Sequence, residues 1–363
     1  QVMALTAELL NILTRGDAKS AWAAIVEQAM AICSKPLASG NAPGEVVKRD
    51  REVGALDHFL AGTGWDLWQA FAQPEMSDIE RTADRLARWW DEPYSAKAVL
   101  ILDGLSLHRL ARWWDEPYSA KAVLILDGLS LRELPWLLQG AKERGYSLHG
   151  VTVTAAEIPG ETNEFAKALG FNSRSQLQNN GGGMTHRLQP AATETVDMPW
   201  KDCASLVGGS PNWVFWHQWP DSKLHDGSGA GQGLDALTRD AADQLSSDDF
   251  WAFVARLATG RRLVITSDHG YAATGLFPDA DGDLGQFLKK TFASGRNAAG
   301  SGDLGPFVPP VALNITSPHG EHRMALGRRK WKSQGGYPTL THGGLSLLEV
   351  LSPYIEITKN HVS

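Results

Sequence analysis

The 363-residue sequence has few cysteines, no long apolar run and no excess of positive charge. Its 2 cysteines, Cys33 and Cys203, are too few for a disulfide framework, and their spacing fits no thiolate metal site. No apolar stretch reaches the roughly 18 residues of a transmembrane helix, and no secretory signal opens the sequence. We therefore expect a cytoplasmic protein that folds without disulfides and does not associate with membranes.

The formal net charge of −7 argues against a protein that coats nucleic acid, because such binding depends on many Lys and Arg contacts to phosphate. No Gly-rich loop with the Lys of an ATP-binding site is present. One basic segment, residues 322–332, contains Arg323 and Arg328 and no acid. It is either a solvated basic surface or an anion-binding patch, and a guanidinium matches the geometry of phosphate.

Two patterns divide the chain. Residues 1–96 have apolar side chains at helical spacing, for example in Met3–Leu13 and Ala21–Ile32, and we expect a helical cap or docking region there. Residues 97–363 alternate short aliphatic runs with helical stretches, which predicts an α/β fold with a mostly parallel central sheet and helices on both faces. The predicted strands are Ala122–Leu126, Ser147–Thr154, Trp213–Trp216, Leu263–Thr266 and Val311–Ile315.

A tandem duplication lies at the boundary between these patterns. Residues 85–107 recur without a change as residues 109–131, so Asp103 and Asp127 are equivalent by sequence. Repeat architectures need three or more copies, so this is no solenoid. Asp127 precedes a long helix and a further strand, as a crossover between parallel strands requires, whereas a short stretch follows Asp103. We expect Asp127 to be the functional copy, and the first copy to lie outside the active centre as an extra helix and a displaced or edge strand.

Acidic and imidazole side chains follow several of the apolar runs. The carboxyl ends of parallel strands are where reactive groups collect, and converging carboxylates need a cation to offset their repulsion. Asp/His ligands without Cys favour zinc, with manganese as the alternative. The candidate ligands are Asp127, Asp221, His225, Asp268, His269 and His342.

The order of these residues resembles that of the alkaline-phosphatase superfamily. The segments ILDGLSLREL, TSDHGY and THGGLSLLEVLSPYIEI are similar to those of the PglZ family, whose members occur in bacterial phage-defence systems. The likeness covers residues 97–363, and THGGLSL is its most specific part. It implies an alkaline-phosphatase-like catalytic domain with two divalent metal ions.

The resemblance also implies a role for each candidate residue. Asp127, Asp268 and His269 would bind one ion, and Asp221, His225 and His342 would bind the other. The nucleophile should lie in the loop AAEIPGETNEFAKALG, where Thr162 enters a helix. An N-capping threonine is the alternative interpretation of Thr162. Arg323 and Arg328 are candidates to hold the non-bridging phosphate oxygens.

These assignments imply a metal-dependent hydrolase of phosphate esters that forms a phosphothreonine intermediate. We expect a phosphodiesterase acting on nucleotides or nucleic acid, with a phosphomonoesterase as the close alternative. A different class of protein also fits the sequence, namely a non-catalytic scaffold that metal ions stabilise within a phage-defence complex. Partner proteins of such a system are expected in either case.

Overall fold

The computed structural model describes residues 5–37, 42–92, 120–183, 185–225, 233–333 and 338–359. The strands are β1 (Ala120–Leu126), β2 (Tyr146–Ala155), β3 (Ala192–Val196), β4 (Trp213–His217), β5 (Arg261–Thr266), β6 (Asn297–Ala299), β7 (Ala312–Ser317), β8 (Gly320–Ala325) and β9 (Leu351–Lys359). The helices that precede β1 are α1 (Ala7–Arg15), α2 (Ala18–Cys33), α3 (Ala42–Gly62), α4 (Trp65–Phe71), α5 (Pro74–Ser77) and α6 (Thr82–Asp91).

The remaining helices alternate with the strands. They are α8 (Leu134–Glu143), α9 (Thr162–Ala168), α10 (Trp200–Leu206), α11 (Asp221–Leu224), α12 (Leu234–Ser246), α13 (Asp248–Ala258), α14 (Gly282–Phe292) and α15 (Leu347–Val350). Among the described residues, the 3-10 helices are η1 (Leu131–Glu133), the kinked η2 (Arg174–Asn180) and η4 (Thr274–Leu276).

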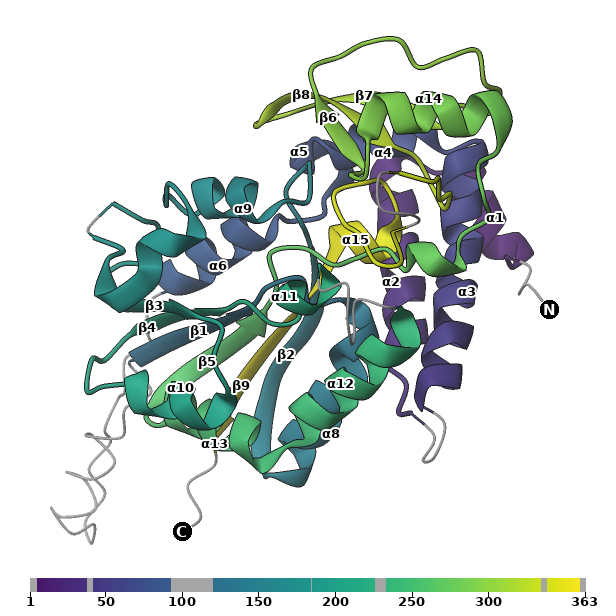
Figure 1. Cartoon of the computed structure of the whole chain (residues 1–363). Helices are drawn as coiled ribbons and strands as arrows, with labels where there is room; N and C mark the ends of the chain where they lie inside the picture. The colour runs from purple at the N-terminus through teal and green to yellow at the C-terminus, as the bar shows by residue number, and fades with distance from the viewer. Residues whose placement is uncertain are drawn as a thin grey trace, which may run out of the picture.

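A six-stranded sheet of order β2-β9-β5-β1-β4-β3 forms the centre of the molecule (Figure 1). Strands β5, β1, β4 and β3 pair in parallel, and β9 is antiparallel to both β2 and β5. The predicted α/β class with a mostly parallel sheet is therefore confirmed. Strands β3 and β9 were not predicted, and β9 reverses the direction of the chain inside the sheet.

Helices cover both faces of this sheet because β1 is apolar on both sides. Leu124 and Leu126 pack with the side chains of α8, α10, α12 and α13 on one face. Val123 and Ile125 pack with α6, α9 and η2 on the other face. A strand with both faces covered is expected to be continuously apolar, and all seven residues of β1 are buried.

The N-terminal helices contact the sheet domain through buried charges on α3. Asp50 is fully buried and receives hydrogen bonds from the guanidinium groups of Arg132, which follows β1, and Arg328, which follows β8. Asp57 accepts a 2.8 Å hydrogen bond from the backbone N–H of Leu347. Removing one member of the buried charge pairs of Asp50 leaves an uncompensated charge, so breaking the contact of α3 with Arg132 and Arg328 is costly.

A second, smaller sheet lies beside the N-terminal helices, with α14 next to it (Figure 1). Its strands have the order β6-β8-β7 and are all antiparallel. The predicted strand Val311–Ile315 corresponds to β7, so its assignment to the central sheet was wrong. An apolar run of this length marks a strand but does not reveal which sheet it joins.

The duplication supplies one element from each copy. Residues 85–91 of the first copy lie in α6, whereas β1 and Asp127 come from the second copy. The Lys121 ammonium donates hydrogen bonds to the carbonyls of Trp89 at 2.6 Å and Glu92 at 3.0 Å, so the end of α6 lies against the start of β1. Residues 93–119, which include Asp103, lie outside the described residues.

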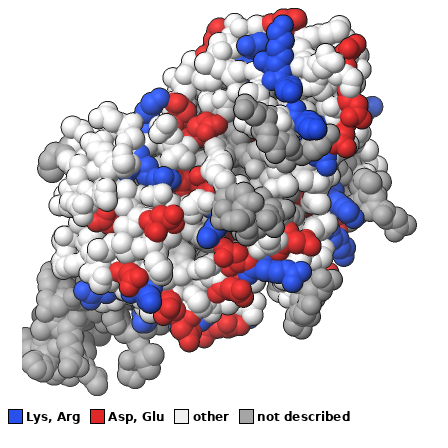
Figure 2. Space-filling model, viewed as in Figure 1, with Lys and Arg blue, Asp and Glu red and all other residues white. Residues whose placement is uncertain are grey.

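In the described part of the chain, the model contains no helix of the length and hydropathy that a membrane crossing requires. Acidic and basic side chains of these residues are interspersed on the face shown in Figure 2.

Candidate metal centre and catalytic site

The predicted ligands meet at one edge of the central sheet. Asp127 follows β1 directly, Asp221 begins α11 after β4, and Asp268 and His269 follow β5. His342 precedes β9, and because β9 runs antiparallel, the residues before it reach the same edge as those after the parallel strands. The structure thus explains how segments more than two hundred residues apart converge.

Asp127, Asp268 and His269 form the first group. One potential ligand atom from each lies within 4.8 Å of the other two, and all three residues are buried. Asp268 Oδ1 accepts hydrogen bonds from the backbone N–H groups of Gly128 at 2.9 Å and His269 at 3.0 Å, which fixes its carboxylate. Gly128 has a φ of 73°, and an added Cβ would lie 3.2 Å from the Cβ of Asp221, so glycine allows the close approach of these loops.

Asp221, His269 and His342 form the second group by the same criterion. His225 lies beside them, with its Nε2 3.3 Å from Asp221 Oδ1 and 3.3 Å from His342 Nε2. All six predicted ligands are therefore brought together, and His269 belongs to both groups.

Two observations fit this cluster to cations. First, the buried atoms Asp221 Oδ1 and Asp268 Oδ2 accept no hydrogen bond of regular geometry among the described residues, although buried polar atoms are normally bonded; the imidazole Nε2 atoms of His225 and His269 lie 3.3 Å and 3.4 Å from them. Second, His269 Nδ1 lies 2.8 Å from the Gly270 carbonyl and His342 Nδ1 lies 3.1 Å from the Gly160 carbonyl. A donated Nδ1–H leaves Nε2 of each ring as a free ligand, the arrangement that metal-binding histidines adopt.

The electrostatics of the protein alone reflect crowded negative charge. Burial and the nearby carboxylates of Asp268 and Asp221 raise the pKa of Asp127 well above its usual value. Burial lowers the pKa of His269, but Asp268, Asp221 and Asp127 outweigh it and raise that pKa to about 9. Cations at this position would relieve the same repulsion.

Thr162 lies at the edge of the first group. Its hydroxyl donates a 3.2 Å hydrogen bond to Asp127 Oδ1, and its Oγ1 is 3.4 Å from His269 Nε2. The guanidinium of Arg174, in η2, contacts the other oxygen of Asp127. A hydroxyl, a guanidinium and the cluster of candidate ligands therefore surround one point.

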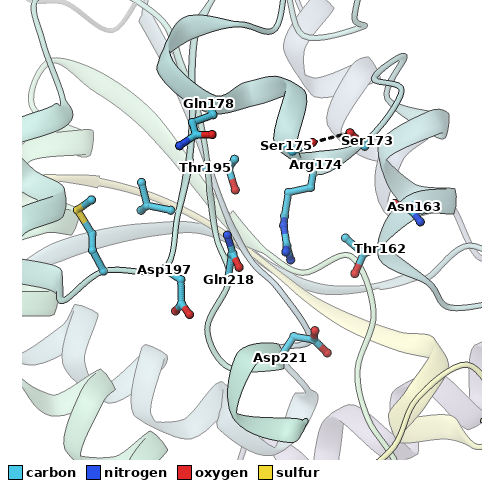
Figure 3. A pocket seen from close by; sticks show the side chains of 12 residues that line it. Thr162, Asn163, Ser173, Arg174, Ser175, Gln178, Thr195, Asp197, Gln218 and Asp221 are labelled. Atoms are coloured by element: carbon cyan, nitrogen blue, oxygen red, sulfur yellow. Dashed lines mark hydrogen bonds between the residues drawn. The ribbon is translucent and has the colours of Figure 1, made fainter. Parts of the chain in front are cut away.

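A cavity of about 490 Å³ opens beside Thr162 and Asp221 (Figure 3). Its wall is built from the start of α9, η2, and the segments after β3 and β4. Ten of its twelve lining residues are polar, the exceptions being Val196 and Met198. This volume falls within the range of ligand pockets, about 300–1,000 Å³.

No family model and no curated protein matches this sequence. Among solved structures, the chain is similar to murine ectonucleotide pyrophosphatase/phosphodiesterase 5, with 12% identity, a TM-score of 0.40, and coverage of 65% of this chain and 87% of that chain. An inactive variant of the murine protein in complex with AMP gives the same values. The human protein covers the same shares at 13% identity and a TM-score of 0.39. At this level the likeness assigns neither a family nor an activity to the chain.

Two predicted phosphate-binding residues do not reach the site. Arg328 bonds to the Asp50 carboxylate and backbone carbonyl, so its guanidinium is committed to α3. Arg323 lies on β8 in the small sheet and makes no contact with the six ligands among the described residues. A phosphate-binding role for these two residues therefore stays a prediction that their contacts do not support. The guanidinium at the site is that of Arg174, which the sequence analysis missed because the polar segment around it has no periodicity or motif.

Proposed function

We propose that this protein is a metal-dependent phosphodiesterase with Thr162 as its nucleophile. The observation that carries the proposal is the convergence of Asp127, Asp268 and His269 beside the Thr162 hydroxyl, with buried carboxylate oxygens that accept no hydrogen bond of regular geometry among the described residues. Asp127, Asp268 and His269 would hold one divalent ion, and Asp221, His225 and His342 would hold the other. Zinc suits this set of oxygen and nitrogen donors, and manganese is the second choice.

Each side chain then has a definite task. When bound, the ions would supply positive charge that neutralises the phosphate and favours ionisation of a nearby hydroxyl. The hydrogen bond to Asp127 orients the Thr162 hydroxyl, whose oxygen forms a bond to phosphorus while the bond to the leaving ester oxygen breaks. Water then hydrolyses the resulting phosphothreonine and regenerates the hydroxyl. Arg174 is close enough to this point to bind a non-bridging oxygen.

The cavity favours a diester over a monoester. Arg174 is the single cationic residue among the described residues that line it, and Asp197 and Asp221 line the same wall. A diester carries one negative charge, whereas a monoester approaches two near neutral pH and would gain from additional cations. The cavity volume also provides room for the second ester group, which a monoester lacks.

A paired assay tests this proposal. Bis-p-nitrophenyl phosphate should be hydrolysed faster than p-nitrophenyl phosphate, and chelation should abolish both activities. Thr162→Ala should keep its bound metal and lose at least about a hundredfold in kcat, while Thr162→Ser should retain activity because it keeps a hydroxyl. Activity that survives chelation, or full activity of Thr162→Ala, contradicts the proposal. Metal binding without any hydrolysis by the wild type would instead indicate the scaffold.

A role in a phage-defence system, together with partner proteins, stays a prediction. It depends on the resemblance of the TSDHGY and THGGLSL segments to the PglZ family.

A further inference from the structure

The cavity beside Thr162 has a phosphate end and an opposite end. Thr162, Arg174 and Asp221 lie at one side of it in Figure 3, and Gln178 and Asp197 lie at the other side. For a diester whose phosphorus lies beside Thr162, the cavity offers room for the retained ester group toward Gln178 and Asp197. The chemistry of that end determines which ester group is accepted.

Several polar side chains at this end could form hydrogen bonds with a ligand. Thr195 is 5% exposed, and its Oγ1 has no hydrogen-bond partner within the described ranges. Gln178 and Asp197 are exposed and Gln218 is half-buried, so these three side chains are accessible to a ligand. Among the described residues, Asp197 accepts one long bond, 3.3 Å, from the Ser222 hydroxyl. A buried hydroxyl without a partner is unfavourable, so a ligand that bonds to Thr195 is stabilised.

Among the residues that the structure describes, the same lining offers no aromatic ring to a nucleobase or to a quaternary ammonium group. No aromatic residue lines the cavity in the described part of the chain, so a nucleobase would find no ring to stack on. Quaternary ammonium groups are usually bound by aromatic cages, which are missing from this lining for the same reason. A long nucleic acid would also need an extended basic surface, whereas charges of both signs are interspersed on the face shown in Figure 2.

Hydroxyl groups of a ligand match the hydrogen-bonding side chains at this end of the cavity. A hydroxyl both donates and accepts, as do the two amides and the Thr195 hydroxyl, and the Asp197 carboxylate accepts from it. Given the proposed phosphodiesterase activity, on which this step rests, we infer that the retained ester group is hydroxyl-rich, a polyol or a sugar, and is recognised by Gln178, Thr195, Asp197 and Gln218.

Two synthetic diesters with one leaving group test this inference. The p-nitrophenyl diester of glycerol phosphate and the p-nitrophenyl diester of thymidine 5′-phosphate both release nitrophenolate, so their rates differ only through the retained group. The zinc-loaded wild type should hydrolyse the glycerol ester with a kcat/KM about tenfold higher. Calorimetry with the Thr162→Ala variant, which should bind without turnover, should give a lower Kd for the glycerol ester than for the thymidine ester.

Variants link the preference to the cavity. Thr195→Val removes the buried hydroxyl at nearly constant shape and should reduce the glycerol-to-thymidine ratio of kcat/KM about tenfold. Thr195→Ser keeps the hydroxyl and should keep most of the preference. Gln218→Leu should also reduce the ratio, whereas Gln139→Leu, the same change on the exposed face of α8, should leave it unaltered.

The results separate this inference from the proposal beneath it. A wild type that prefers the thymidine ester, or a preference that Thr195→Val does not change, overturns the inference while the phosphodiesterase proposal stands. If the wild type hydrolyses none of the three diesters, namely the glycerol ester, the thymidine ester and bis-p-nitrophenyl phosphate, the phosphodiesterase proposal is contradicted. In that case calorimetry still decides the inference, since tighter binding of the glycerol ester supports it and tighter binding of the thymidine ester overturns it.

Discussion

Replacing Asp127 by asparagine should stabilise the protein when metal is removed. Asp127 is fully buried, and its ligand atom lies within 4.8 Å of the corresponding atom of Asp268. Two unit charges at that separation would repel by about 3 kcal/mol at an effective dielectric constant of about 20, and the folded state bears a comparable cost when Asp127 instead holds a proton that the unfolded chain releases. The raised pKa of Asp127 shows that burial and repulsion outweigh the attraction of Arg174 and His269. The neutral amide keeps the size of the side chain and removes the repulsion.

The net effect is smaller than the repulsion itself. Loss of the contact with Arg174, which is partly exposed, offsets about 1 kcal/mol. Asp127→Asn should therefore raise the free energy of unfolding by about 2 kcal/mol in chelator, which corresponds to a melting temperature about 3 °C higher. Zinc should reverse the order, because an excess of about 100 Kd stabilises the wild type by about 2.7 kcal/mol and the variant has lost one ligand.

Differential scanning calorimetry in chelator and in zinc measures both effects. Asp243→Asn, at an exposed position on α12, is the matched control and should change neither melting temperature by more than about 1 °C. If Asp127→Asn destabilises the metal-free protein, or if zinc stabilises it as much as the wild type, the carboxylates do not form a cation site in the manner described.

Three other variants test the packing around the site. Because burial raises the pKa of Asp57 from 3.8 to about 7, the folded state keeps a proton that the unfolded chain releases between these pH values. In urea denaturation, Asp57→Asn should thus have little effect near about pH 4 and a stabilising effect of up to about 4 kcal/mol near about pH 8; equal effects at both pH values would contradict the assignment. Asp50→Ala leaves the guanidinium groups of Arg132 and Arg328 without their carboxylate, so the same assay should show a loss of about 3–5 kcal/mol, and an unchanged denaturation midpoint would argue against a tight contact of α3. Deleting residues 85–108 leaves one copy of the duplication and a four-residue link from α6 to β1; zinc content and melting temperature should match the wild type, and an unfolded product would show that the longer connection is required.

The candidate site could be predicted from the sequence because its ligands are local signals. Asp127 directly follows the apolar run of β1, and Asp268 and His269 come shortly after that of β5; the carboxyl ends of parallel strands share one edge of a sheet. Asp221 and His225 lie one helical turn apart in the loop after β4. The convergence of these residues therefore required only the correct strands and their common direction.

Other features depend on contacts that no local pattern encodes. Arg328 stands in a basic segment, and its partner Asp50 is 278 positions away in the chain, so nothing nearby indicates a buried ion pair. Arg174 lies in a polar stretch without periodicity. The position of β9 between β2 and β5 is a property of the whole sheet, and an apolar run reads the same in either direction.

The position of β9 also constrains the order of events during synthesis. A nascent chain that has emerged as far as β8 carries every parallel strand, but β2 has no neighbour to pair with until β9 enters between it and β5. His342 lies ahead of α15 and β9, so it emerges after the other five candidate ligands. We therefore expect the pairing of β2 and the assembly of the complete candidate site to wait until β9 has emerged.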